Sequence, residues 1–68
     1  MKLKKIFSCN VRKYRLAQNL SQEELAEKAG VHRTYIGSVE RGERNITINV
    51  MEKICIALEI PITDLFKE

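Results

Sequence analysis

Residues 20–42 read LSQEELAEKAGVHRTYIGSVERG, and this stretch decides the fold. Ser21, followed three residues later by Glu24, forms a capping box, in which the two side chains satisfy free backbone amides at a helix start. Gly30 can adopt the positive φ that ends a helix. The stretch therefore predicts a short helix, a tight glycine turn and a second short helix that ends near Gly42.

Apolar residues in this stretch recur at helical spacing. Those expected to face inward are Leu25, Ala29, Val31, Ile36 and Val39. Ala26 is small, and it lies where two helices must approach closely. Two short helices that cross at a large angle need a small residue at the crossing and a positive-φ residue between them. These are the requirements of a helix-turn-helix.

The rest of the chain continues the helical pattern. A first helix is expected over residues 3–18, with one apolar face formed by Leu3, Phe7, Val11 and Tyr14. Thr47 is expected to cap a fourth helix, which Pro61 breaks. Residues 62–66 then form a last helical turn. We predict an all-α fold, with one compact five-helix domain over residues 1–68.

Length and composition exclude several classes of protein. The chain has 68 residues, 44% hydrophobic and 31% charged, which is typical of a soluble folded domain with one small core. We expect no enzyme, because nothing pairs a nucleophile with a base in a cleft. We expect no small-molecule ligand, because a chain this short has no room for a ligand-binding domain. Two cysteines and one histidine offer no metal-ligand set, so no metal or cofactor is expected. No signal peptide or membrane-spanning run is found, which predicts a cytoplasmic protein without a membrane partner.

The net charge of +3 is unevenly distributed. The first 20 residues contain six lysines and arginines and no acidic residue. A second basic group, Arg33, Arg41 and Arg44, follows an acidic stretch. Such a polarised surface suits a polyanion. A solvated basic face without a partner is the alternative, and charge alone does not decide between them.

The sequence resembles the phage lambda repressor and Cro-like helix-turn-helix family in residues 20–31 and 36–42. Within that family it is most similar to the controller proteins of restriction-modification systems, through residues 33–36, 40–41 and 44–47. Other small regulators of the family share such strings. The resemblance implies a five-helix lambda-repressor-like fold, in which the second helix crosses the DNA backbone and the third enters the major groove.

The same resemblance implies a sequence-specific transcriptional regulator that binds double-stranded DNA. We expect a homodimer on a roughly palindromic operator, with control of a restriction-modification system as the favoured setting. A phage-type repressor and an antitoxin are the alternatives of the same kind. A protein-interaction module that has kept the fold without specific DNA binding is the alternative from another class.

Two sets of residues are expected to contact DNA. The base contacts are expected from Arg33, Thr34, Tyr35, Ser38 and Arg44. Arg33 is the strongest candidate, because a guanidinium can bond both O6 and N7 of guanine, although it can also neutralise a phosphate. The phosphate contacts are expected from Ser21, Gln22, Asn45, Arg12 and Lys13. For Ser21 and Gln22 the reason is that a helix N-terminus favours an anion.

Other residues are expected to support the site or to join two copies. By resemblance, Arg15 on the first helix pairs with Glu40 at the end of the third. Ile56 lies off the inward face of the fourth helix, where family members usually carry a polar residue. With Ile62 and Phe66 it is expected to form the homodimer interface. Scattered exposed apolar residues are the alternative.

An acidic face is expected on the second helix, from Glu23, Glu24 and Glu27. In some family members this face contacts RNA polymerase, and ordinary solvated glutamates are the alternative. Glu59 occupies a helix end where the family prefers glycine, which leaves the geometry of that turn open.

Overall fold

The computed structural model describes residues 2–68, and it is helical with no strand over that range. Its elements are α1 (Lys2–Ala17), α2 (Gln22–Ala29), α3 (Arg33–Glu40), α4 (Ile48–Leu58) and the 3-10 helix η1 (Ile62–Phe66). Met1, where the predicted domain begins, lies outside the described residues. The all-α prediction is confirmed. The expected fifth helix is a single 3-10 element, so four α-helices are present in this range and not five.

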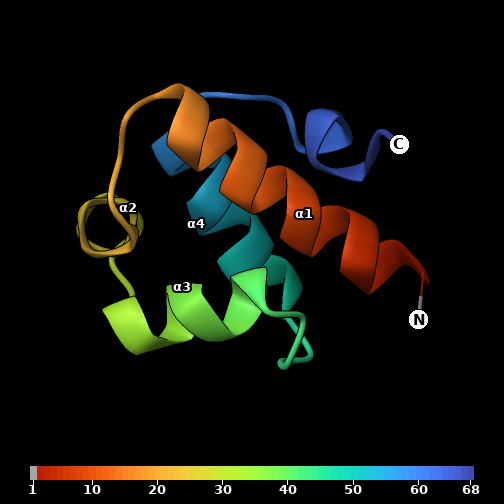
Figure 1. Cartoon of the computed structure of the whole chain (residues 1–68), viewed down its shortest axis with the longest axis horizontal. Coiled ribbons are helices and arrows are strands. Elements are labelled where there is room, and N and C mark those ends of the chain that lie inside the picture. Colours follow the sequence, from red (N-terminus) through yellow and green to blue (C-terminus); the bar gives the residue numbers. More distant parts are fainter. Residues whose placement is uncertain (1) are drawn as a thin grey trace.

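α4 buries one side against the other elements and leaves its other side exposed. α1 and α3 contact each other, α2 joins them at one end (Figure 1), and α4 packs mainly against α2. After α4 the chain returns along α1, so η1 packs against the first half of α1 near both termini. None of the helices in residues 2–68 is both long and apolar enough to cross a membrane.

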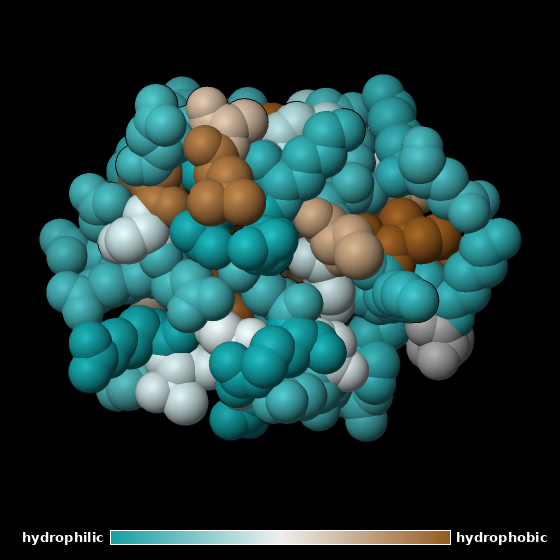
Figure 2. Space-filling model, in the orientation of Figure 1, coloured by the Kyte–Doolittle hydropathy of each residue, from teal (hydrophilic) through white to brown (hydrophobic). Residues whose placement is uncertain are grey.

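Every helix contributes buried side chains to the core. Its largest fully buried side chains are Phe7, Val11, Leu25, Ile36, Val39, Ile54, Leu58 and Leu65. Among the residues predicted to face inward, Ala29 is also buried, and Val31 is partly buried against the core. The face seen in Figure 2 is mostly hydrophilic, with hydrophobic side chains emerging in separate places.

The inward face of α1 is shorter than predicted. Phe7 and Val11 are buried and Tyr14 is partly buried, but Leu3 is 54% exposed. The reason is geometric, because the first turn of α1 extends past α3 and α4 (Figure 1). Leu3 therefore shares the face of Phe7 but lies beyond α3 and α4 and stays exposed.

The helix ends follow the local signals. The Ser21 hydroxyl accepts from the Glu24 N–H at 3.0 Å, and the Glu24 carboxylate accepts from the Ser21 N–H at 2.8 Å. The second of these hydrogen bonds holds the pKa of Glu24 below its ordinary value. Gly30 ends α2 with φ +71°, and Thr47 caps α4 by accepting from the Val50 N–H at 3.2 Å. The predicted capping box, glycine turn and Thr47 cap are all confirmed.

One side chain of α1 and one just after it bind the second half of the chain, and the sequence analysis missed both. The Asn10 amide donates to the carbonyls of Leu65 and Lys67 at 2.9 and 2.8 Å. The Gln18 amide donates to the Leu58 carbonyl at 2.7 Å. These bonds satisfy backbone carbonyls that the end of α4 and the short η1 leave free.

At the turn after α4, Glu59 adopts the left-handed backbone conformation that glycine commonly adopts at a helix end. Its φ of 58° and ψ of 43° are left-handed, and its N–H closes α4 by donating to the Ile56 carbonyl at 3.1 Å. A left-handed conformation is costly for a residue with a Cβ. Glu59 therefore stores backbone strain at the helix end.

Replacing Glu59 should release that strain. We expect Glu59→Gly to raise the free energy of unfolding by up to about 1 kcal/mol, because the relief exceeds the added chain entropy of glycine. Urea denaturation followed by circular dichroism measures this. Glu59→Gln is the control, since it removes the carboxylate from the helix C-terminus but keeps the Cβ. Equal stability of the two variants would show that backbone strain contributes nothing.

Candidate nucleic-acid interface

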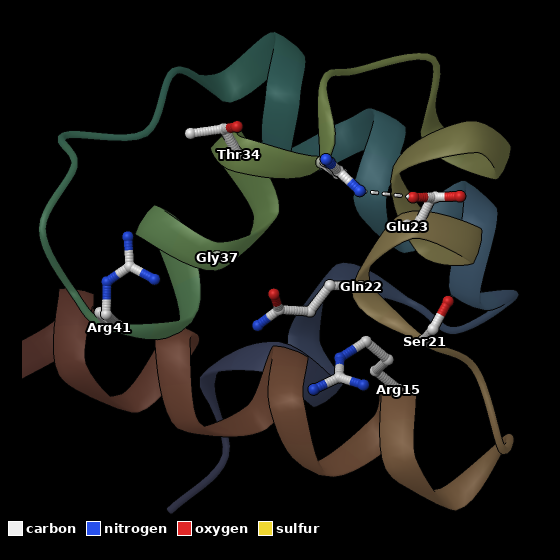
Figure 3. A pocket seen from close by; sticks show the side chains of 8 residues that line it. Arg15, Ser21, Gln22, Glu23, Thr34, Gly37 and Arg41 are labelled. Carbon is white, nitrogen blue, oxygen red and sulfur yellow. Dashed lines mark hydrogen bonds and ion pairs between the residues drawn. The ribbon is translucent and has the colours of Figure 1, made fainter.

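A shallow hollow lies between the start of α2 and the exposed side of α3. The residues that line it are Arg15, Ser21, Gln22, Glu23, Arg33, Thr34, Gly37 and Arg41 (Figure 3). Five of these were predicted to contact DNA or to support the site, and they come from three different helices. The fold thus brings together residues that are up to 19 positions apart in the sequence.

A buried ion pair forms the floor of the site. Arg15 Nε lies 2.6 Å from Glu40 Oε2, and Arg15 Nη2 lies 3.0 Å from Glu40 Oε1. The two side chains are only 9% and 3% exposed. The hydrogen bond to Glu40 raises the pKa of Arg15 above its ordinary value. Since the third nitrogen of Arg15 donates to the Leu20 carbonyl at 2.8 Å, the guanidinium also fixes the turn before α2.

Gln22 joins α2 to this ion pair. Its Nε2 donates to Glu40 Oε1 at 3.1 Å, so Glu40 binds side chains from both α1 and α2. In Figure 3 the Gln22 side chain lies between Arg15 and Gly37. A Cβ on Gly37 would lie only 3.1 Å from Arg41 Nη1 and 3.4 Å from Gln22 Oε1. Glycine at this position leaves room for both side chains.

The start of α3 presents its first turn to solvent. Arg33 and Thr34 are exposed, whereas Ile36 and Val39 of the same helix are buried. His32 caps the helix, with its Nδ1 accepting from the Thr34 N–H at 3.1 Å. The cap and the core contacts fix the direction in which Arg33 and Thr34 leave the helix.

A second hollow lies at the end of α3 and is lined by Ser38, Glu43, Arg44 and Asn45. Arg44 and Asn45 are exposed, and the Arg44 guanidinium lies 4.7 Å from the centre of the Tyr35 ring. Ser38 differs from its expected placement. It is 7% exposed, and its hydroxyl donates to the Thr34 carbonyl at 3.0 Å. This geometry does not favour a base contact by Ser38, because its donor is already used within α3.

The basic residues predicted on α1 lie apart from these hollows. Arg12 and Lys13 are exposed, and Lys13 Nζ lies 5.7 Å from the centre of the Tyr14 ring. Neither residue lines the hollow between α2 and α3. They lie on α1, beside the hollow and outside its lining.

Two surface ion pairs at the site were missed by the sequence analysis. Arg33 Nη1 lies 2.8 Å from Glu23 Oε2, and Arg41 Nε lies 3.0 Å from Glu43 Oε2. No helical spacing links Glu23 to Arg33, since the glycine turn separates them. Only the angle between α2 and α3 brings them together.

Residues 11–65 match the family described as Helix-turn-helix. The chain belongs to this family. It is 52% identical over 65 residues to "Control protein C.SmaI" of Serratia marcescens, which covers 96% of this chain and 77% of that protein. It is 46% identical over 61 residues to "Control protein C.BamHI" of Bacillus amyloliquefaciens, covering 88% and 75%.

The solved structures agree with the sequence relatives. The restriction-modification controller protein C.AhdI from Aeromonas hydrophila superposes with a TM-score of 0.89 at 41% identity, covering 93% of this chain and 96% of that one. The resemblance identified from the helix-turn-helix residues is therefore confirmed, including its similarity to controller proteins.

Breaking the buried ion pair should destabilise the domain. We expect Glu40→Gln to lower the free energy of unfolding by about 3 kcal/mol, because the charge of Arg15 stays buried without a counter-charge. Urea denaturation measures the loss. The double variant Arg15→Met with Glu40→Gln removes both charges and should recover part of it. If the Glu40→Gln variant were as stable as the parent chain, solvent would be compensating the positive charge of the Arg15 guanidinium.

Proposed function

We propose that this chain is a sequence-specific DNA-binding transcriptional regulator, the controller protein of a restriction-modification system. The observation that carries the proposal is the exposed first turn of α3, where Arg33 and Thr34 project from a helix that is fixed in the core. The similarity to controller proteins over nearly the whole chain supports the biological setting.

The shape of α3 fits a major groove. An α-helix with its side chains is about 10–12 Å in diameter, and the eight residues of α3 extend about 12 Å along its axis. The major groove is about 12 Å wide and admits one helix. α3 lies at the lower edge of the molecule as drawn in Figure 1, and its first turn is exposed, so this side of the helix is available to a groove. Arg33 would then read guanine through two hydrogen bonds, with Thr34 and Tyr35 beside it.

The phosphate contacts would flank this helix on both sides. Ser21 and Gln22 lie at the N-terminus of α2, where free amides and the helix dipole favour an anion. Asn45 follows α3, on the opposite side, and Arg44 before it would contact a base. Phosphates held at both ends would fix the position of α3 in the groove, which is the usual role of backbone contacts.

We further propose that two copies pair through Ile56, Ile62 and Phe66. Ile56 is 68% exposed on α4 and Ile62 is 38% exposed on η1, and these two elements contact each other. Phe66 is partly buried, and its ring lies 5.4 Å from that of Phe7. A two-fold pairing would place the α3 helices about 34 to 36 Å apart, one helical turn of DNA.

Selection of bound duplexes from a random pool, at about physiological salt, tests the proposal. Enrichment of two inverted half-sites about one helical turn apart is the expected result. Weak, steeply salt-dependent binding without enrichment would contradict the proposal. A protein-interaction module that keeps the fold would then account for the chain.

Two variants distinguish a base contact from a purely electrostatic contribution to DNA binding. We expect Arg33→Ala to weaken operator binding by about 1–3 kcal/mol and to relax the preference at one base pair of each half-site. Lys13→Ala should weaken binding equally for all sequences and lower the salt slope by about one. Fluorescence anisotropy over a salt series measures both. An even loss across all sequences for Arg33→Ala would assign that residue to phosphate.

A further inference from the structure

We propose that Glu23 determines sequence specificity by pairing with Arg33. The pair keeps the Arg33 guanidinium from DNA phosphates but still lets it bind a guanine. This inference rests on the proposed function and adds a residue to it. The carboxylate of Glu23 would compete with DNA phosphates for the Arg33 guanidinium. On the cognate site, Arg33 would bind guanine without losing Glu23 altogether.

The geometry places Glu23 where it can act on Arg33. Glu23 lies in the first turn of α2, and Arg33 is the first residue of α3. Arg33 Nη1 donates to Glu23 Oε2 at 2.8 Å, and the dashed line at Glu23 in Figure 3 marks this bond. The bond crosses the mouth of the hollow in which α2 and α3 meet. Arg33 is therefore already bound when DNA arrives.

The pair is weak enough to be broken during binding. The two side chains are 67% and 68% exposed, and exposed ion pairs contribute little to stability because water screens them. The Arg15–Glu40 pair beneath it is buried and doubly hydrogen-bonded. The fold does not need the Glu23–Arg33 pair, so its effect falls on what Arg33 binds.

Phosphates and guanine differ in how they meet this pair. On non-specific DNA the main partners of Arg33 would be phosphates, which repel the Glu23 carboxylate beside it. Ser21 and Gln22, where a phosphate is expected, lie at the start of the same helix as Glu23. A phosphate bound there would stay close to the Glu23 carboxylate, so the repulsion would persist.

A guanine edge carries no net charge and offers two acceptors, O6 and N7. A guanidinium has five donors, so two bonds to guanine leave donors for Glu23. Glu23 thus penalises the wrong partner more than the right one, which raises specificity without adding a contact to DNA.

Glu27 provides a matched control. It lies one turn after Glu23 on the same helix, is exposed, and carries the same charge. Within residues 2–68 it is not paired with Arg33, whose guanidinium is held by Glu23. Glu24 is unsuitable as a control, because its carboxylate completes the capping box with Ser21.

The experiment compares Glu23→Gln and Glu27→Gln with the parent chain. Dissociation constants are measured by fluorescence anisotropy for the selected operator and for a scrambled duplex of equal length, over a salt series. We expect Glu23→Gln to tighten binding to the scrambled duplex by about three- to tenfold, with less than about a twofold change on the operator. Glu27→Gln should change both constants by the same small factor and leave their ratio unaltered.

The outcomes separate this inference from the proposed function. If Glu23→Gln and Glu27→Gln have the same ratio of dissociation constants for the scrambled duplex and the operator, the role of Glu23 is overturned. The proposed function as a regulator would be unaffected. If the parent chain prefers no duplex, both proposals fall. In an Arg33→Ala background, Glu23→Gln should no longer change the ratio, and a change there would also overturn the inference. Urea denaturation of each variant shows that the fold is intact.

Discussion

The arrangement of the site depends on the buried ion pair between Arg15 and Glu40. Glu40, at the end of α3, accepts hydrogen bonds from Arg15 on α1 and from Gln22 on α2, so one carboxylate joins three helices. A domain of 68 residues has little apolar surface with which to fix the angle between two eight-residue helices. A charged group buried with its partners supplies that constraint, because any other helix arrangement would leave the charge uncompensated.

The two ion pairs of the site have different roles, one in the position of α3 and one in what Arg33 binds. Arg15–Glu40 lies in the interior and fixes where α3 sits, whereas Glu23–Arg33 lies on the surface and determines which partner Arg33 accepts. Burial explains the difference, since removing a buried charge leaves its partner unsatisfied and removing an exposed one leaves it to water. Stability and recognition are thereby assigned to separate pairs, so a change in Arg33 need not disturb the fold.

The sequence predicted what local chemistry controls. Ser21 with Glu24, and Gly30, mark the ends of α2 because each acts on backbone within a few residues. The bonds from Asn10 to carbonyls in and just after η1 cross more than 50 positions, and no periodicity marks them. Ser38 was expected to contact a base by resemblance to the family, because it lies one turn after Thr34 on α3. In a helix as short as α3, the buried side is wide enough to include it, and its hydroxyl turns to the backbone.

The residues expected to contact DNA are held in place before any DNA is bound. His32 caps the turn that carries Thr34, Glu23 holds Arg33, and the Arg44 guanidinium stacks on a neighbouring ring. A long side chain that is free in solution loses rotamer entropy when it binds, and this loss subtracts from affinity. Side chains already restricted by weak exposed contacts lose less. The surface contacts that contribute least to folding are therefore the ones that matter most for recognition.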